Sequence, residues 1–304
     1  MNPTFSRRLL LVHAHPDDET INNGATMAGY VAEGAAVTLV TCTRGEEGEV
    51  LVPSLEHLSS ARDDALGPFR ESELAAAMGE LGVTDFLFLG EPESGYRDSG
   101  MMDTPPNENP HSFWLADLDE ACSHLVAIIR DRKPQVLITY DEFGGYGHPD
   151  HIKAHRVAMR SVELAADPTF GVGEPWEISK IYWSAIPRSA LHGSLVSSNL
   201  FIQILIKFFN YVPSRWLALP FVKADGVVTT KYDGDKFLLN KLAALRSHKT
   251  QLIIHGDQFK FTKRLSTRIG GSEYYIRVKG EAGAPYDQNG RELDLFAGVL
   301  SARE

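Results

Sequence analysis

The amino-acid sequence predicts an α/β protein built on a mostly parallel sheet with helices on both faces. Two observations lead to this prediction. Apolar runs alternate with helix-like segments over the first 185 residues, and 43% of the 304 residues are hydrophobic, enough for a large buried core. Strands that alternate with helices are joined by right-handed crossovers, which place helices on both sides of a parallel sheet.

The first three predicted elements are a strand, a helix and a second strand. The apolar run at residues 9–13 predicts the first strand. A helix is expected over residues 22–33, because Gly34 provides a stop signal directly after it. The second strand is expected at residues 37–41.

The next elements follow the same order. A second helix is expected over residues 70–81, stopped by Gly82, and a third strand at residues 85–89. The third helix is the clearest by period, because apolar residues recur at helical spacing, namely Leu118, Cys122, Leu125 and Ile129. Pro134 ends this helix.

Three further elements complete the expected core: a strand at residues 136–140, a helix at 149–165 and a strand at 180–185. Two connections are unusually long, at residues 43–69 and 90–113. Both leave strand ends at the edge of the sheet where ligands bind, and loops of this length are usually functional or disordered.

The C-terminal third is less regular. Strand-like segments occur at residues 226–232 and 273–278, and a helix is expected at residues 235–248. Polar residues interrupt the hydrophobic segment at residues 200–221, so it falls short of a membrane span. We expect this segment to be an irregular helical cover on the core; a lipid-facing or subunit-facing patch is the alternative.

The composition disfavours several classes of partner. The formal net charge of −10 argues against nucleic acid and anionic membranes. Neither Cys42 nor Cys122 lies in a CxxC motif, so buried reduced thiols and a cytoplasmic location are expected. The apolar run after Arg8 is too short for a signal peptide.

Three common motifs are absent from the sequence. No GxGxxG follows the first strand, so a nicotinamide or flavin site is not supported. No GxxxxGK[ST] occurs, which argues against nucleotide hydrolysis. No GxSxG occurs, which argues against a serine hydrolase.

Two polar clusters follow predicted strands. HPDDE at residues 15–19 comes after the first strand, and YGHPDH at residues 146–151 lies past the strand at 136–140. Each cluster has an ordinary explanation when taken alone: capping carboxylates at a helix N-terminus for the first, and loop residues for the second. Because ligands bind at the carboxyl ends of parallel strands, the joint occurrence favours a mononuclear metal site.

His15, Asp18 and His151 form the candidate ligand set. A metal that activates water needs about three protein ligands and an open position, which two imidazoles and one carboxylate provide. Zn²⁺ is the natural choice for hydrolysis, because it lowers the pKa of bound water to about 7. Fe²⁺ accepts the same ligands.

Four neighbouring side chains are candidates for catalysis. Asp17 is placed to take a proton from water, and a helix-capping role is its alternative. His148, if protonated, could stabilise an oxyanion or protonate a leaving amine. Asp150 could fix the tautomer of an imidazole, and Tyr146 could donate a hydrogen bond to a carbonyl oxygen.

The two clusters resemble the motifs of the LmbE-like (PIG-L) zinc de-N-acetylases. TCTRGEEGEV at residues 41–50 and YRDSGM at residues 96–101 look like the mycothiol-pathway branch of that family. The resemblance covers most of the first 165 residues. Beyond them it depends on the chain length and on ALRSHKTQ at residues 244–251.

The resemblance implies a Rossmann-like fold with one zinc ion on the ligand set named above. It implies that Asp17 is the general base, that His148 stabilises charge or acts as an acid, and that Tyr146 polarises the substrate carbonyl. It also implies contacts to the inositol and sugar hydroxyls, from Arg70, Asp98 and Glu49.

The activity implied by the resemblance is hydrolysis of the N-acetyl group of an N-acetylglucosaminyl-inositol, which releases acetate. One alternative is an amidase that cleaves mycothiol S-conjugates, whose substrate shares the glucosamine–inositol half; the loops at residues 46–50 and 97–101 look more like the deacetylase. Two more distant alternatives are a non-haem iron oxygenase and a non-catalytic sugar-binding module.

No linker marks an independent second domain. We therefore expect residues 1–304 to form a single catalytic domain. In this interpretation residues 1–185 hold the metal site, and residues 186–304 complete the fold and cover the substrate cleft.

Overall fold

A seven-stranded sheet forms the centre of the computed structural model, which describes residues 7–90, 95–197, 221–260 and 265–299. Its strand order is β3-β2-β1-β4-β5-β13-β9. The strands are β1 (Arg8–His13), β2 (Ala36–Thr41), β3 (Asp85–Phe88), β4 (Val136–Thr139), β5 (Lys180–Ser184), β9 (Thr230–Asp233) and β13 (Ser272–Lys279). The strands β1 to β5 are parallel and β13 is antiparallel to both of its neighbours, which confirms the predicted, mostly parallel sheet.

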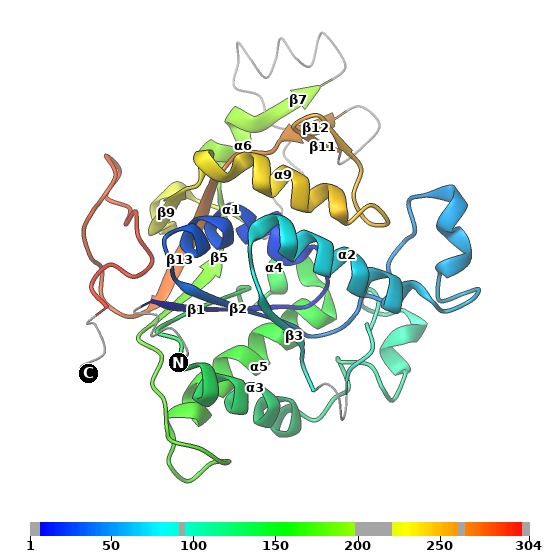
Figure 1. Cartoon of the computed structure of the whole chain (residues 1–304), viewed down its shortest axis with the longest axis horizontal. Coiled ribbons are helices and arrows are strands. Elements are labelled where there is room, and N and C mark those ends of the chain that lie inside the picture. Colours follow the sequence, from blue (N-terminus) through cyan, green and yellow to red (C-terminus); the bar gives the residue numbers. More distant parts are fainter. Residues whose placement is uncertain (1–6, 91–94, 198–220, 261–264, 300–304) are drawn as a thin grey trace.

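Helices cover both faces of the sheet, as predicted (Figure 1). One face carries α1 (Asp18–Ala32), α2 (Leu66–Leu81) and α9 (Leu238–Ser247), which contact one another. The other face carries the packed pair α3 (Leu118–Arg132) and α5 (Pro149–Ala166).

The central strand β1 shows why an apolar run forms a buried strand. Successive side chains point to opposite faces, so Leu10 and Val12 join the core beneath α3 and α5, while Leu9 and Leu11 join the core beneath α1 and α2. All four side chains are buried. A polar residue at any of these positions would lie in one of the two cores.

The strand order changes direction between β1 and β4. From β1 the chain builds outward through β2 to β3, and from β4 it builds the other way to β5. At such a switch point the loops leaving the two central strands diverge and open a crevice at their carboxyl ends. The fold thus brings together the two polar clusters at residues 15–19 and 146–151.

Several predicted boundaries were wrong. The helix expected from residue 22 begins at Asp18, because the preceding turn is tight: Asp17 has a φ of 128°, and its carbonyl oxygen accepts a hydrogen bond from Ile21. The helix expected from residue 70 begins at Leu66. The strand expected over residues 226–232 is divided into a 3₁₀ turn, η3 (Asp225–Val227), and β9.

The C-terminal portion carries small elements that the sequence pattern did not predict. Two small sheets join β6 (Ile186–Pro187) to β8 (Val222–Lys223), and β7 (Leu195–Ser197) through β12 (Leu265–Arg268) and β11 (Gln258–Lys260) to β10 (Ile254–His255). The short helical segments are α4 (Gly144–Gly147), α6 (Arg188–Ser194), η1 (Pro53–Leu58), η2 (Pro105–Glu108) and η4 (Asp235–Phe237). The predicted cover at residues 200–221 lies outside the described residues except for its last position.

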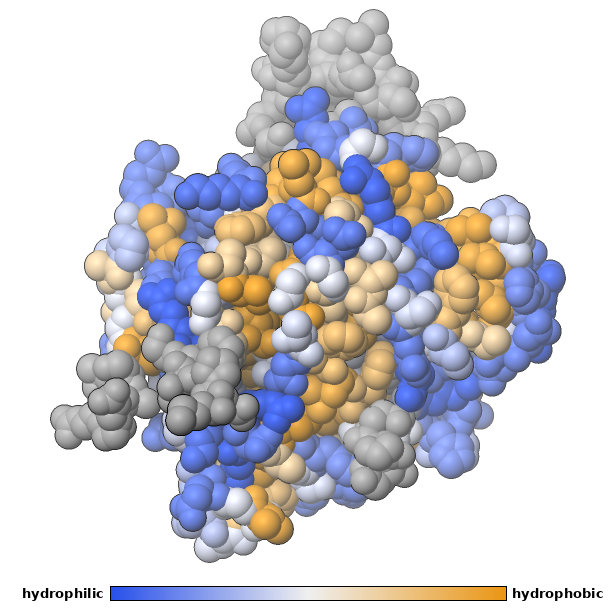
Figure 2. All heavy atoms as spheres, in the orientation of Figure 1, coloured by the Kyte–Doolittle hydropathy of each residue, from blue (hydrophilic) through white to orange (hydrophobic). Residues whose placement is uncertain are grey.

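The surface in the orientation of Figure 1 is mixed. Figure 2 shows hydrophilic residues around the periphery of this face and hydrophobic residues across its middle. Within the described ranges, no helix combines the length and the apolar character needed to cross a membrane.

Candidate metal centre

Three donor atoms converge where the loops after β1 and β4 meet. Oδ2 of Asp18 lies 3.4 Å from Nδ1 of His15 and 3.3 Å from Nε2 of His151, and these two nitrogens are 3.3 Å apart. All three side chains are buried. A tetrahedral Zn²⁺ ion with bonds of about 2.0–2.1 Å separates its ligand atoms by roughly 3.3–3.4 Å. The three atoms are therefore spaced as ligands of one such ion.

The opposite edge of the His15 ring faces two carboxylates. Nε2 of His15 lies 3.2 Å from Asp150 and 3.5 Å from Asp98, and Ser99 donates a main-chain hydrogen bond to Asp150 at 2.9 Å. Burial alone would lower the pKa of His15, but the carboxylates of Asp98, Asp150 and Asp18 raise it well above its usual value. The pocket thus favours positive charge, which suits a bound cation, and Nδ1 is the nitrogen that faces the ligand cluster.

The ring of His151 is fixed on two sides. Its Nδ1 donates a hydrogen bond to the carbonyl oxygen of Gly144 at 3.1 Å, which leaves Nε2 as the lone-pair nitrogen facing Asp18. Tyr140 stacks on the ring with centroids 4.3 Å apart. Partners of this kind fix the tautomer and orientation of a metal-binding imidazole.

Gly144 offers a test of this arrangement. Its φ is +64°, and an added Cβ would lie 2.6 Å from Cβ of His151 and 2.7 Å from N of Ile152. Gly144→Ala is expected to displace His151, to lower the metal content at limiting metal, and to destabilise the fold by about 1–3 kcal/mol. Metal analysis and thermal unfolding would measure both effects.

Gly226→Ala is the matched control, since a Cβ at Gly226 meets no atom within 4 Å. This variant should keep the wild-type metal content and melting temperature. An unchanged metal content in Gly144→Ala would show that close packing of Gly144 against His151 is not needed for metal binding.

Asp17 lies beside the ligand cluster in an uncommon backbone conformation. It occupies the N-cap position of α1, but its side chain makes no capping hydrogen bond, so the capping alternative was wrong. Its Oδ2 lies 3.2 Å from Arg70. Burial raises the pKa of Asp17 to about 6, although the Arg70 guanidinium acts in the opposite direction. A carboxylate with a pKa near neutrality suits proton transfer.

The structure places the three residues expected to contact substrate in different surroundings. Arg70 is buried and donates to the carbonyl oxygens of Gly45, at 2.8 Å, and of Pro16. Asp98 is buried beside His15, whereas Glu49 is exposed. Arg70 and Asp98 therefore hold protein groups in place, and of the three residues only Glu49 is exposed to solvent.

His148 and Tyr146 complete the cluster. Nδ1 of His148 accepts a hydrogen bond from the main-chain N–H of Asp150 at 3.2 Å, so in the neutral ring the proton lies on Nε2. Burial, followed by the charges of His15 and His151, lowers the pKa of His148 to about 3. Tyr146 is 47% exposed, and its ring meets His151 with centroids 4.9 Å apart. His148 is therefore a neutral hydrogen-bond donor rather than a cation.

Two buried groups near Asp17 were not assigned from the sequence. Nε2 of His248 lies 3.0 Å from Oε1 of Glu19, and both side chains are 0% exposed. The other oxygen of Glu19 accepts a hydrogen bond from the main-chain N–H of Asp17 at 2.9 Å. Their positions in the HPDDE cluster and in the segment at residues 244–251 were the only sequence signals for them.

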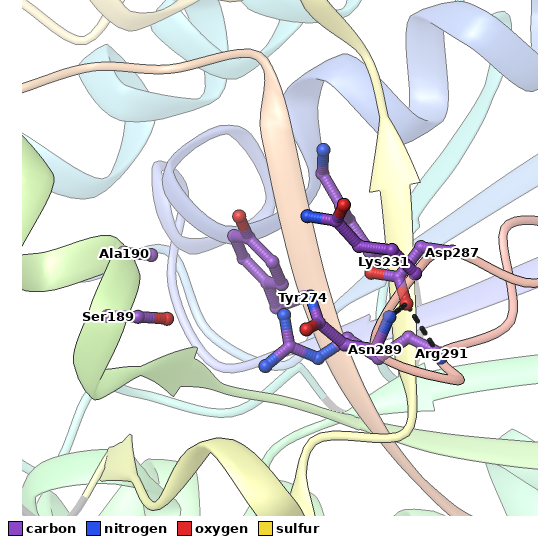
Figure 3. Close-up of a pocket in the computed structure, with 8 residues that line it drawn as sticks. Ser189, Ala190, Lys231, Tyr274, Asp287, Asn289 and Arg291 are labelled. Carbon is purple, nitrogen blue, oxygen red and sulfur yellow. Dashed lines mark hydrogen bonds between the residues drawn. The ribbon is translucent and has the colours of Figure 1, made fainter.

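A separate cavity opens at the β9–β13 end of the sheet (Figure 3). Its volume is about 460 Å³, and its lining includes Tyr274, Lys231 and Arg291. Its lining contains none of the residues of the metal centre. The predicted chemistry therefore does not use this cavity.

The fold and the site together define a class of protein. A mostly parallel α/β sheet gathers two histidines and an aspartate at its switch point, which is the arrangement of a metal-centre protein of Rossmann-like fold. The family model described as PIG-L, GlcNAc-PI de-N-acetylase, matches residues 10–162. The chain belongs to this family, as its motifs predicted.

Close relatives match over nearly the whole chain. A protein of Streptomyces avermitilis named 1D-myo-inositol 2-acetamido-2-deoxy-alpha-D-glucopyranoside deacetylase is 54% identical, over 96% of this chain and 97% of its own. A protein of Geodermatophilus obscurus with the same name is 54% identical, over 97% of this chain and 99% of its own.

Solved structures share the fold at lower identity. N,N'-diacetylchitobiose deacetylase from Pyrococcus horikoshii is 20% identical, with a TM-score of 0.54 over 81% of this chain and 71% of its own. A 4-carboxy-2-hydroxymuconate hydratase from Pseudomonas putida is 16% identical, with a TM-score of 0.59 over 92% of this chain and 100% of its own. Since a deacetylase and a hydratase share this fold, the fold alone does not choose the reaction.

Proposed function

We propose that this chain is a Zn²⁺-dependent deacetylase of 1D-myo-inositol 2-acetamido-2-deoxy-α-D-glucopyranoside, a step of the mycothiol pathway in which acetate is released. The convergence of three ligand atoms beside the partly buried carboxylate of Asp17 is the observation that carries this proposal. The full-length similarity to relatives that bear this name supports the substrate.

Nδ1 of His15, Oδ2 of Asp18 and Nε2 of His151 would hold the metal. Bound Zn²⁺ supplies Lewis acidity, which makes water more acidic and polarises the acetyl carbonyl. Imidazole and carboxylate ligands also accept Fe²⁺, and we favour Zn²⁺ because the reaction is a hydrolysis.

The residues around the metal would move the protons. Asp17 takes a proton from water as the water oxygen forms a bond to the amide carbon. Nε2–H of His148 and the hydroxyl of Tyr146 donate hydrogen bonds to the oxygen that becomes negatively charged. The carbon–nitrogen bond then breaks, and the amine leaves with the proton that Asp17 took from water. Asp150 orients His15 throughout.

Substrate recognition forms part of the same proposal. Glu49, Asp98 and Arg70 are its candidate contacts to the sugar and inositol hydroxyls. The exposed position of Glu49 favours a direct contact. Arg70 and Asp98 are buried and bonded to protein groups, which favours an indirect role through Asp17 and His15.

We further propose that residues 1–304 act as one cytoplasmic catalytic domain, with residues 186–304 over the cleft. The strands β9 and β13 extend the central sheet, and α9 packs on α1 and α2. Both cysteines, Cys42 and Cys122, are free thiols in buried positions, as suits a reducing compartment.

Acetate release tests the proposed function. The metal-loaded protein is expected to release one acetate per molecule of N-acetylglucosaminyl-inositol, because the acyl group leaves in a single hydrolysis. Chelation should stop the release, and added Zn²⁺ should restore it. Enzymatic measurement of acetate with and without chelator would show both effects.

The cysteinyl amide of the same glucosaminyl-inositol provides the comparison with an amidase. The acetyl substrate is expected to have the higher kcat/KM, since a pocket that fits one acyl group discriminates against the other. No acetate from the metal-loaded protein would remove the leading substrate.

A further inference from the structure

We infer that Glu19 and His248 form a positioning pair for the base of the reaction, holding the main chain of Asp17 in the conformation that places its carboxylate beside the metal ligands. This inference rests on the proposed function, because it is there that Asp17 is the base. It also gives a role to the segment at residues 244–251, which contains His248.

The conformation of Asp17 needs external support. Its φ of 128° and ψ of −32° lie where a residue with a side chain is rarely found. Such a conformation costs about 1–3 kcal/mol and persists only when surrounding contacts impose it. The contacts that impose it therefore decide where the Asp17 carboxylate lies.

Glu19 supplies one of these contacts. Its Oε2 accepts a hydrogen bond from the main-chain N–H of Asp17 at 2.9 Å, two residues earlier in the chain. The bond fixes the peptide that joins Pro16 to Asp17. Arg70 supports the same turn from the other side, by donating to the Pro16 carbonyl oxygen and to the Asp17 carboxylate.

His248 keeps the Glu19 carboxylate available as this acceptor. Glu19 is fully buried, and a buried carboxylate is costly without a charged or hydrogen-bonded partner. His248 provides that partner at 3.0 Å, and the hydroxyl of Thr20 provides another at 2.5 Å.

The chain after His248 is anchored to the elements around the site. Thr250 donates main-chain and hydroxyl hydrogen bonds to Glu73 of α2, at 3.0 and 2.6 Å. Its carbonyl oxygen accepts from the N–H of Leu51, in the long connection after β2, at 2.8 Å. A rigid anchor of this kind lets the C-terminal portion set the position of Asp17 through His248.

Two other buried ion pairs show what is particular to Glu19 and His248. Lys180 pairs with Glu292 at 2.7 Å, and Lys241 pairs with Glu273 at 2.6 Å. The carboxylates of these pairs also accept main-chain hydrogen bonds, Glu292 from Gly283 and Glu273 from Ala25 and Thr26. What is particular to Glu19 is its donor, because that main-chain N–H belongs to Asp17, the proposed base.

A double-mutant cycle tests the inference. His248→Gln is expected to lower kcat for acetate release about tenfold, with KM changed less than about twofold and the metal content unchanged, because only the base is displaced. In an Asp17→Asn background the same substitution should lower kcat by less than about twofold, since the base has already been removed. His255→Gln, at an exposed histidine of the C-terminal portion, is the control and should match the wild type.

Glu19→Gln is the second variant, and it keeps an oxygen that can accept from Asp17 N–H. It is expected to retain more activity than Glu19→Ala, which removes the acceptor. Equal losses in these two variants would contradict the hydrogen bond as the cause. A loss of kcat in His248→Gln that is the same with and without Asp17 would show a general structural role and overturn the inference.

Crystal structures separate this inference from the proposed function. In metal-loaded His248→Gln, the turn at Asp17 is expected to leave its positive φ, whatever the substrate of the enzyme. Wild-type protein that releases no acetate would remove the proposed function. Comparison of the wild-type and His248→Gln crystal structures would still decide the positioning role. An unchanged Asp17 conformation in the variant would overturn that role.

Discussion

Asp18→Asn is expected to lose most of the bound metal and to lower acetate release by at least about 10³-fold, because Lewis acidity contributes several kcal/mol to such a reaction. In the wild type, the Asp18 carboxylate accepts a hydrogen bond from the main-chain N–H of His15 at 3.0 Å. Asparagine keeps the shape of the side chain and an oxygen that can accept the same bond. The substitution therefore removes the negative charge between two imidazoles with little change in packing. Metal analysis and steady-state kinetics would measure the two losses.

Asp119→Asn provides the matched control. Asp119 is exposed in the first turn of α3, so its substitution should leave the metal content and the turnover at wild-type values. The wild type should also melt at a higher temperature with metal than without it, whereas Asp18→Asn should show little of this difference. Full metal occupancy in Asp18→Asn would remove Asp18 from the ligand set.

Asp17→Asn is expected to lower kcat by roughly 10²–10⁴-fold while the metal stays bound, because a general base contributes a factor of this size. Asparagine cannot take a proton from water, but it can keep a hydrogen bond to Arg70 and so preserve the turn. Kinetics at saturating substrate and metal analysis of the same sample would separate this result from the Asp18 result.

The contrast between the two variants is the informative comparison. Asp18→Asn should lose metal and activity together, and Asp17→Asn should lose activity alone. Near-normal turnover in Asp17→Asn would assign the base to another residue. Loss of metal in Asp17→Asn would instead place Asp17 among the ligands.

The parts of the fold that the sequence predicted are those set by local patterns. The apolar runs of β1 and β4 and the helical spacing of Leu125 and Ile129 in α3 depend on residues close together in the chain. The start of α1 was missed, because contacts from distant residues support the positive-φ turn at Asp17: Arg70 directly, and His248 through Glu19. The two-residue strands β6 and β8 are too short to show a period.

The candidate site also contains residues that the sequence predicted and residues that only the structure revealed. His15, Asp18 and His151 could be predicted, because they follow two strands whose ends meet at the switch point. The contact of Glu19 with His248 joins residues 229 positions apart, and a single sequence contains no signal for such a pair. Asp150 was predicted as the partner of an imidazole and lies 3.2 Å from His15, whereas the contacts of Glu19 and His248 at the proposed base were visible only in three dimensions.

The position of β13 affects how the chain must fold. This strand lies between β5 and β9, although it begins at residue 272 and β5 ends at residue 184. While the protein is being synthesised, the edge of β5 that β13 will cover stays open until residues 272–279 have emerged from the ribosome. Pairings over such long sequence separations slow folding, and an open strand edge can bind another chain. Nascent molecules of this protein therefore pass through an aggregation-prone stage that ends only when β13 has been made and has paired with β5.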